Sequence, residues 1–386
     1  MDFTFDEEQQ AIAETAKGIF GGLVTPERVE NVEAGEDRID RELWAELARA
    51  DLLGLSVPEA HGGGGYGMVE VALVLEAQGR SVAPVPLWAT EVLGAMPIAE
   101  FGSDPLQESI LPGVVSGQTM LTAALTDVAG DIATGGDGRP SIVATAVGGG
   151  VSLTGSAFAV PYAHVADRIL VPAALDGGVV VATVDPSAKG VEIERAFTTN
   201  REIHPHLHLD EVKVPYDDVL AAGDPSRGRD VLMAVLNRAW TGLCALQVGV
   251  TEAAVSQTAA YLNTREQFGR PLSTFQGTML RAADAAIDTE SIRVTMWQAA
   301  WRLDRGLDAE LEVSVASWFA AEAGQRAVFA TQHLHGGLGA DISYPIHRYF
   351  LWGKQIELLL GPPSSQLARL GEHLTSELLA GREVLT

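Results

Sequence analysis

The segment YLNTREQFGRPLSTFQ, residues 261–276, is the most specific pattern in this chain of 386 residues. A helical pattern runs into it, and Gly269 and Pro271 then break the helix just after Arg265. Gln276 follows as the expected start of the next helix. Arg265 offers a planar, forked cation of the kind that binds phosphate or carboxylate. Taken alone, the segment also fits a corner between two helices with a solvated arginine.

The composition indicates an acidic globular protein. An apolar share of 47% suffices for buried cores, and the length predicts two or three domains. The net charge of −25 argues against nucleic acid or an anionic membrane as a partner. The single cysteine, Cys244, excludes a disulfide within the chain and suits the reducing cytoplasm. We expect no signal peptide and no apolar run long enough to span a membrane.

Three regions follow one another along the chain. Residues 1–118 read as helical, with one helix expected over residues 68–81, and residues 223–386 return to long helical patterns. Residues 119–222 hold short runs rich in Val, Leu and Thr, which predict a small antiparallel β domain. The run of four glycines at residues 62–65 lacks the features of a phosphate loop, so we interpret it as a flexible connection.

A second segment, QHLHGGLGADISYPIHR at residues 332–348, completes the pattern. Together with residues 261–276 and the stretch GLSVPEAHGGGGYG at residues 54–67, it resembles the acyl-CoA dehydrogenase family. The resemblance covers nearly the whole chain. It implies an α+β fold with an N-terminal α-helical domain (1–118), a middle β-barrel or sandwich domain (119–222) and a C-terminal four-helix bundle (223–386).

The resemblance implies FAD as cofactor and assigns residues to it. Arg265 suits the doubly charged pyrophosphate, and bare glycine backbone lets a nucleotide approach closely. In the family these contacts come from the neighbouring subunit. The positions matched to the adenylate half of FAD are Arg265, Gln267, Phe268, Leu272, Gln276, Gln332, Gly336 and Gly337, and those matched to the flavin ring are Thr126 and Val160.

The family's catalytic glutamate is missing at both positions that the resemblance indicates. One lies sixteen residues after Tyr344 and holds Leu360, and the other holds Ala239. Neither side chain can accept a proton. Glu357 lies one helical turn before Leu360 and is the remaining candidate base, although a surface or interface carboxylate is the interpretation we favour.

The middle region also departs from the family pattern. Its flavin-contacting segment corresponds to residues 125–131, LTDVAGD, which are shorter than in the family and lack its serine. Val160 stands where the family has a hydroxyl. The residues that a subunit gives its own flavin ring are therefore degraded, while those that it gives its neighbour's adenylate are kept.

This division leads to our principal functional hypothesis. The chain resembles the less complete subunit of actinobacterial α2β2 acyl-CoA dehydrogenases associated with steroid side-chain oxidation. We expect a homologous partner to supply the base for α,β-dehydrogenation of an acyl-CoA, and the family implies an electron-transfer flavoprotein as acceptor. A homotetrameric flavoenzyme with another base or other chemistry, and a homologue without flavin, remain alternatives. The small residues around Gly242 could leave room for a bulky acyl group or close the pocket.

Three histidines alternate in the segment IHPHLHL, at His204, His206 and His208. In a strand they would face one side, and Pro205 suggests a strand at a sheet edge. Because we find no acid or cysteine to complete a metal site, we expect no metal here.

Overall fold

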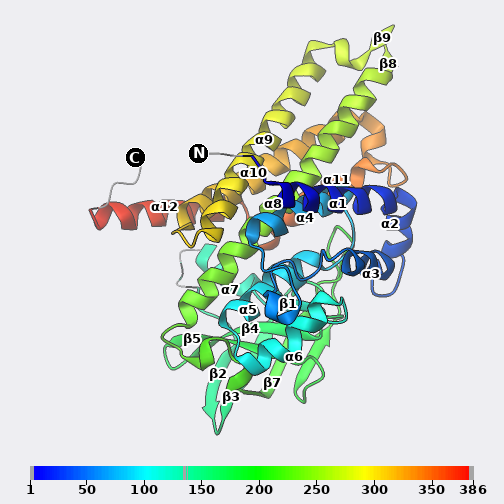
Figure 1. Cartoon of the computed structure of the whole chain (residues 1–386). Helices are drawn as coiled ribbons and strands as arrows, with labels where there is room; N and C mark the ends of the chain where they lie inside the picture. Colours follow the sequence, from blue (N-terminus) through cyan, green and yellow to red (C-terminus); the bar gives the residue numbers. More distant parts are fainter. Residues whose placement is uncertain (1–3, 134–135, 137, 382–386) are drawn as a thin grey trace.

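The computed structural model describes residues 4–133, 136 and 138–381, and it places a sheet at one end of a long helical body (Figure 1). The N-terminal helices wrap the middle of that body. They are α1 (Glu7–Leu23), α2 (Pro26–Glu33), α3 (Arg41–Arg49), η1 (Glu59–His61), α4 (Met68–Ser81), the π-helix η2 (Trp88–Ala95), α5 (Met96–Phe101) and α6 (Asp104–Val115). The helix expected over residues 68–81 is confirmed.

The middle region forms one curled sheet of seven strands. They are β1 (Leu121–Ala123), β2 (Val143–Val147), β3 (Gly150–Ala157), β4 (Arg168–Leu175), β5 (Gly178–Val184), β6 (Val191–Glu194) and β7 (His206–Pro215). The order is β1-β4-β2-β3-β7-β6, with β5 also paired to β4.

The expectation of a purely antiparallel domain is wrong, because β4 pairs parallel with β1 and β2. Parallel pairing needs a long crossover, and the chain between β1 and β4 contains the helix α7 (Thr126–Ala133) and the β2–β3 hairpin. The helix α7 includes most of the segment 125–131, which was compared above with a flavin-contacting segment.

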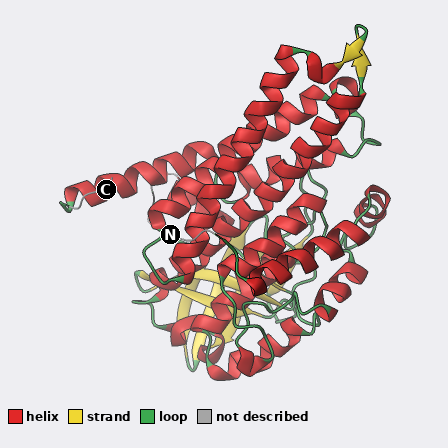
Figure 2. Cartoon of the chain, turned by 45° about the horizontal axis from the view of Figure 1, so that its top comes forward, coloured by secondary structure: helices red, strands yellow, loops and turns green. Residues whose placement is uncertain are grey.

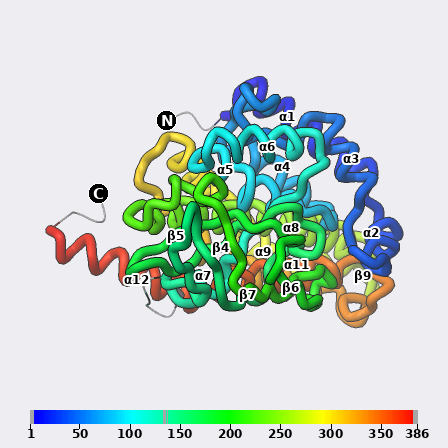
Figure 3. The backbone as a smooth tube through the Cα atoms, turned by 90° about the horizontal axis from the view of Figure 1, so that it is seen from below, coloured from blue at the N-terminus to red at the C-terminus, as the bar shows by residue number. Residues whose placement is uncertain are grey.

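The C-terminal region is a bundle of long helices. The short turns η3 (Tyr216–Asp218) and η4 (Leu220–Gly223) lead into α8 (Gly228–Thr264), which packs against α9 (Gln276–Asp304), α10 (Glu310–Leu334) and α11 (Ile346–Leu359). The small hairpin β8 (Glu266–Gln267) and β9 (Arg270–Pro271), followed by η5 (Leu272–Thr274), lies at the far tip of the bundle (Figures 1 and 2). The last helix, α12 (Pro363–Leu379), extends away from the body (Figure 3).

The helix α8 is the centre of the molecule. By length and composition it could cross a membrane, but 78% of its most apolar window is buried inside the chain, as in a core helix. Its close contact with α4 depends on two glycines. A Cβ added at Gly249 would lie 2.0 Å from the carbonyl oxygen of Glu76, and one added at Gly79 would lie 2.1 Å from that of Leu246. Backbone therefore meets backbone along this interface.

We predict that Gly249→Ala lowers the free energy of unfolding by roughly 1–3 kcal/mol, because the new methyl group forces α4 and α8 apart. The matched control is Gly371→Ala in α12, where an added Cβ meets nothing within 4 Å. That variant should be as stable as the wild type or slightly more stable, since alanine favours a helix. Urea unfolding measures both, and equal stabilities would contradict the packing argument.

Candidate functional site

A cleft opens at the tip of the bundle, where the two sequence segments meet. We call it the distal cleft. Its volume is about 600 Å³, and it is open to solvent. It lies between the end of α8, the hairpin, the start of α9, the end of α10 and the turn η6 (Gly336–Ala340). Its lining residues are Tyr261, Arg265, Gln267, Leu272, Phe275, Gly277, Thr278, Arg281, His333, Leu334, His335, Gly336 and Gly337.

The β8–β9 hairpin holds Arg265 at the mouth of the distal cleft. Arg265 ends α8, and its carbonyl oxygen accepts a hydrogen bond of 2.9 Å from the N–H of Leu272. The two-residue turn of the hairpin has positive φ at both Phe268 (56°) and Gly269 (78°), an uncommon conformation for phenylalanine. Phe268 is 91% exposed and does not line the cleft, although its ring meets that of Phe275 edge-on with centroids 6.2 Å apart, so its match to an adenine wall stays a prediction.

The opposite wall of the cleft is bare backbone. A Cβ added at Gly336 or Gly337 would meet nothing within 4 Å, so these glycines leave open space in the single chain. The turn is fixed by Gln332, whose side-chain amide donates to the carbonyl oxygen of Gly339 at 2.9 Å. Gln332 and Gln276 do not line the cleft in the single chain, and their roles toward a ligand also stay predictions.

Of the lining residues that the sequence analysis did not predict, Arg281 and His335 bear most directly on ligand binding. Arg281 adds a second cation to the cleft from the start of α9. His335, the second of them, follows the end of α10. It is 2% exposed, and its ring stacks on Tyr261 with centroids 4.5 Å apart. Burial lowers the pKa of His335, although a hydrogen bond to the Thr331 carbonyl opposes the shift. Arg281 lies outside both quoted segments, and His335 lies within residues 332–348 at a position that the resemblance did not assign to FAD.

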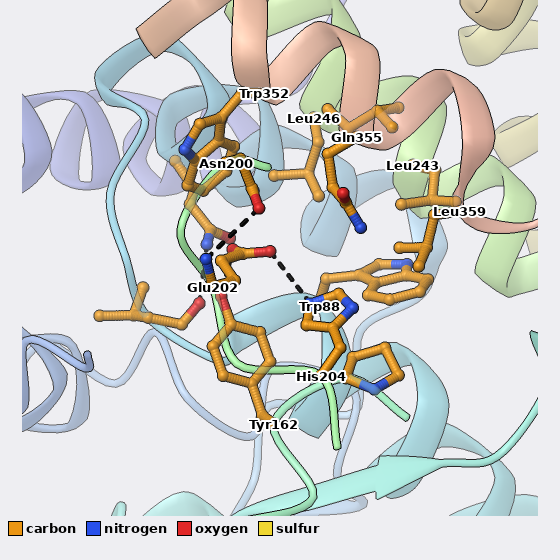
Figure 4. A pocket seen from close by; sticks show the side chains of 14 residues that line it. Trp88, Tyr162, Asn200, Glu202, His204, Leu243, Leu246, Trp352, Gln355 and Leu359 are labelled. Atoms are coloured by element: carbon orange, nitrogen blue, oxygen red, sulfur yellow. Dashed lines mark hydrogen bonds and ion pairs between the residues drawn. The ribbon is translucent and has the colours of Figure 1, made fainter. Parts of the chain in front are cut away.

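A second, much smaller cavity lies between the sheet and the helices at the centre of the chain (Figure 4). This central cavity has a volume of only about 30 Å³, which is room for about one water molecule. Its walls include the aromatic side chains of Trp88, Tyr162 and Trp352. Pro161, which directly follows Val160, lines this cavity, whereas Val160 and Thr126 themselves do not.

Neither residue matched to the flavin ring offers it a free polar group: Val160 is buried, and the hydroxyl of Thr126 bonds to its own chain. Val160 is fully buried, and its N–H donates to the carbonyl oxygen of Pro205 at 2.8 Å. The hydroxyl of Thr126 donates to the carbonyl oxygen of Ala159 at 3.4 Å. Within the described residues, this side of the chain presents no free hydroxyl at either position.

A hydrogen-bonded cluster fills the floor of the central cavity. The Tyr162 hydroxyl donates to one carboxylate oxygen of Glu202 at 2.5 Å, and His204 Nε2 lies 3.1 Å from the other (Figure 4). Burial opposes ionisation of Glu202, but the hydrogen bonds of His204 and Tyr162 hold its pKa below the usual value. Burial and then the Glu202 charge raise the pKa of Tyr162. Tyr162 also has a strained φ of 55°.

The two positions of the missing glutamate are closed by tryptophan. The indole N–H of Trp240 donates to the carbonyl oxygen of Leu360 at 2.9 Å. That of Trp88 donates to the carbonyl oxygen of Ala239 at 3.1 Å. Trp88 also packs on Gly242, where an added Cβ would lie 2.7 Å from the indole ring. The indole ring of Trp88 therefore fills the space beside Gly242, which could otherwise have held part of an acyl group.

Glu357 does not face this space. It is 8% exposed, lies outside the lining of the central cavity and pairs with the ammonium group of Lys354. Of the expected surface or interface carboxylate, the surface position is wrong, because Glu357 is buried, and the interface position stays a prediction. The pairing of Glu357 with Lys354 opposes a role as a free base.

The alternating histidines do not share one strand. His204 precedes β7 and is buried, while His206 and His208 lie within it. The expected edge strand is wrong as well, because β7 lies between β3 and β6. The expectation that no acid accompanies these histidines is wrong for two of them, because His204 pairs with Glu202 and His208 pairs with Glu194. In the described part of the chain, no group of three potential ligands could hold a metal ion.

The two cavities differ in how well they fit FAD: the distal cleft suits its adenylate half, and the central cavity does not suit its flavin ring. The distal cleft combines two arginines, open glycine backbone and a buried histidine nitrogen without a partner among the described residues. These features suit a nucleotide pyrophosphate and its base. The central cavity of about 30 Å³ has no room for a flavin ring.

We predict that Glu202→Gln costs stability at neutral pH and costs less in acid. Because the folded pKa of Glu202 lies below its usual value, its contribution is present above the ordinary carboxyl pKa and is lost as the pH falls through the folded value. Urea unfolding at several values between pH 7 and pH 3 measures the difference from the wild type. A difference that stays constant or grows in acid would contradict this assignment.

Comparison with known proteins agrees with the fold and the motifs. The family models for the N-terminal and C-terminal domains of acyl-CoA dehydrogenase match residues 6–118 and 226–375. The acyl-CoA dehydrogenase FadE27 of Mycobacterium tuberculosis is 38% identical over 382 residues, which cover 97% of this chain and 99% of that protein.

Two solved structures are also similar. The ChsE4-ChsE5 complex from Mycobacterium tuberculosis contains a chain that is 38% identical with a TM-score of 0.90, covering 97% of this chain and 99% of that one. A variant of the Tcur3481-Tcur3483 steroid ACAD is 42% identical with a TM-score of 0.89 over the same shares. This chain therefore belongs to the acyl-CoA dehydrogenase family, whose members are FAD-dependent oxidoreductases.

Proposed function

We propose that this chain is one subunit of a heteromeric acyl-CoA dehydrogenase and completes the flavin site of a homologous partner chain. The observation that carries the proposal is the contrast between two of its cavities. The distal cleft, which matches the donated half of the family's flavin site, is open and measures about 600 Å³. The central cavity, which matches the chain's own half, measures about 30 Å³.

The proposed reaction is α,β-dehydrogenation of an acyl-CoA thioester. FAD, when bound, accepts the hydride that leaves the β carbon. The chain's own part is binding and positioning: Arg265 and Arg281 neutralise the pyrophosphate, while Leu272 and Phe275 offer apolar surface for the adenine. Leu360 and Ala239 transfer no proton, so the partner supplies the base.

In this proposal the acyl group also binds in the partner subunit. Trp88 and Trp240 lie against Ala239 and Leu360, and the cavity that remains beside Leu360 among the described residues measures only about 20 Å³, too little for an acyl chain. The relatives described as a two-component complex and as a steroid ACAD support a heteromeric enzyme and a bulky substrate. An electron-transfer flavoprotein as acceptor and a cytoplasmic location complete the proposal.

An apolar stripe along α9 supports assembly with a partner. Leu280, Ile287, Val294 and Trp301 lie seven residues apart and are 37–63% exposed. Residues at this spacing share one face of a helix, and exposed apolar stripes mark interfaces. Leu280 is adjacent to Arg281 in the distal cleft. A partner that covers the stripe would therefore also reach the cleft.

We predict that Arg265→Ala lowers the flavin content of the complex isolated through a tag on this chain by about tenfold or more, because the pyrophosphate loses its forked cation. Visible absorbance after gel filtration gives flavin per complex. Arg49→Ala in α3 is the control, since Arg49 is an exposed arginine remote from the cleft. Unchanged flavin in the Arg265 variant would refute the proposed role of the cleft.

We also predict that Ile287→Asp weakens assembly by at least tenfold, because it places a charge in an apolar interface. Leu307→Asp is the matched control, as Leu307 is 44% exposed and lies outside the α9 stripe. Analytical ultracentrifugation of each variant with the co-purified partner measures the association. Equal association of the two variants would show that the stripe is not the interface.

A further inference from the structure

His335 stands out among the residues of the distal cleft, because one of its nitrogens is buried without a partner. It follows the end of α10, and its ring lies between those of Tyr261 and Tyr344, with centroid distances of 4.5 Å and 5.4 Å. Nε2 has no hydrogen-bond partner among the residues that the structure describes. A buried polar atom of this kind calls for an explanation.

The other ring nitrogen fixes the chemistry of Nε2. His335 Nδ1 lies 2.9 Å from the carbonyl oxygen of Thr331, and a carbonyl oxygen can only accept. Nδ1 therefore carries the hydrogen. Burial lowers the pKa of His335, which keeps the ring neutral at pH 7. In a neutral ring with its hydrogen on Nδ1, Nε2 is a bare acceptor that lacks a donor.

The two arginines of the cleft do not meet that need when a dinucleotide is bound. Arg265 and Arg281 are donors only, and they suit the phosphates. The phosphate oxygens accept and do not donate, so they suit the arginines and not Nε2. The adenylate half of a dinucleotide carries its donors elsewhere, on the exocyclic amine of adenine and on the ribose hydroxyls.

We propose that His335 is a specificity residue, whose Nε2 accepts a hydrogen bond from the adenine amine or a ribose hydroxyl of the dinucleotide held in the distal cleft. This inference rests on the proposed function. In the cleft, two arginines then hold the phosphates, and one acceptor nitrogen recognises the nucleoside. A site built to bond a donor rejects an analogue that lacks it, because the buried acceptor is then left unpaired.

The test measures discrimination in the complex isolated through a tag on this chain. After removal of bound flavin, the complex is titrated with FAD, with its hypoxanthine analogue, in which a carbonyl oxygen replaces the amine, and with its 2′-deoxy and 3′-deoxy adenosine analogues. Flavin fluorescence gives each dissociation constant. In the wild type, one analogue should bind about tenfold more weakly than FAD, and its identity names the donor.

The variants assign that discrimination to His335. In His335→Phe, which keeps a flat ring between the tyrosines, FAD and the three analogues should bind within about twofold of one another. His335→Gln keeps an acceptor oxygen and should retain part of the preference. Arg265→Ala should weaken all four ligands alike and leave the preference in place. A purely structural role for His335 would also weaken all four alike.

Two results would overturn the inference. One is a wild-type complex that binds FAD and its three analogues equally. This result is measured on the wild type alone and does not depend on the folding of any variant. The other is a preference that persists unchanged in His335→Phe. Both leave the proposed function standing, because FAD still binds. A wild-type complex that binds no FAD at all would overturn the proposed function together with this inference.

Discussion

Two indole hydrogen bonds keep the centre of this molecule closed. Trp240 reaches the carbonyl oxygen of Leu360, and Trp88 reaches that of Ala239, so each indole N–H is satisfied inside the core. Buried indoles with bonded N–H groups are large and rigid, and moving one would expose an unpaired donor. Because these rings lie beside both positions matched to the family's glutamate, where Leu360 and Ala239 stand, the proposed function assigns the base and the substrate to the partner.

The contrast with the closed centre indicates what the open cleft at the tip of the bundle could do. The β8–β9 hairpin holds Arg265 and an exposed Phe268 at the far end of the bundle, away from the chain's own sheet. The proposed function explains this cleft, which is lined by arginines and bare glycine backbone. It is accounted for when the ring belongs to another chain and the apolar stripe on α9 brings that chain alongside.

Much of this could be predicted from the sequence because the decisive patterns are local. The helix Met68–Ser81 and the start of α9 at Gln276 follow from periodicity and turn residues. The absence of glutamate at Leu360 and Ala239 could be read directly from the family pattern. Features made by distant segments could not be predicted. The parallel pairing of β4, the bond between Tyr162 and Glu202 and the bare nitrogen of His335 each depend on how separate elements pack.

The most direct test of this account is the amount of flavin per chain, in the protein alone and in the complex isolated from its native cells. The account predicts almost no FAD in the chain alone and about one FAD for every two chains in the complex, because only the partner has room for the ring. About one FAD per chain in the protein alone would contradict it, since that would require a working flavin site where the structure shows a cavity of about 30 Å³.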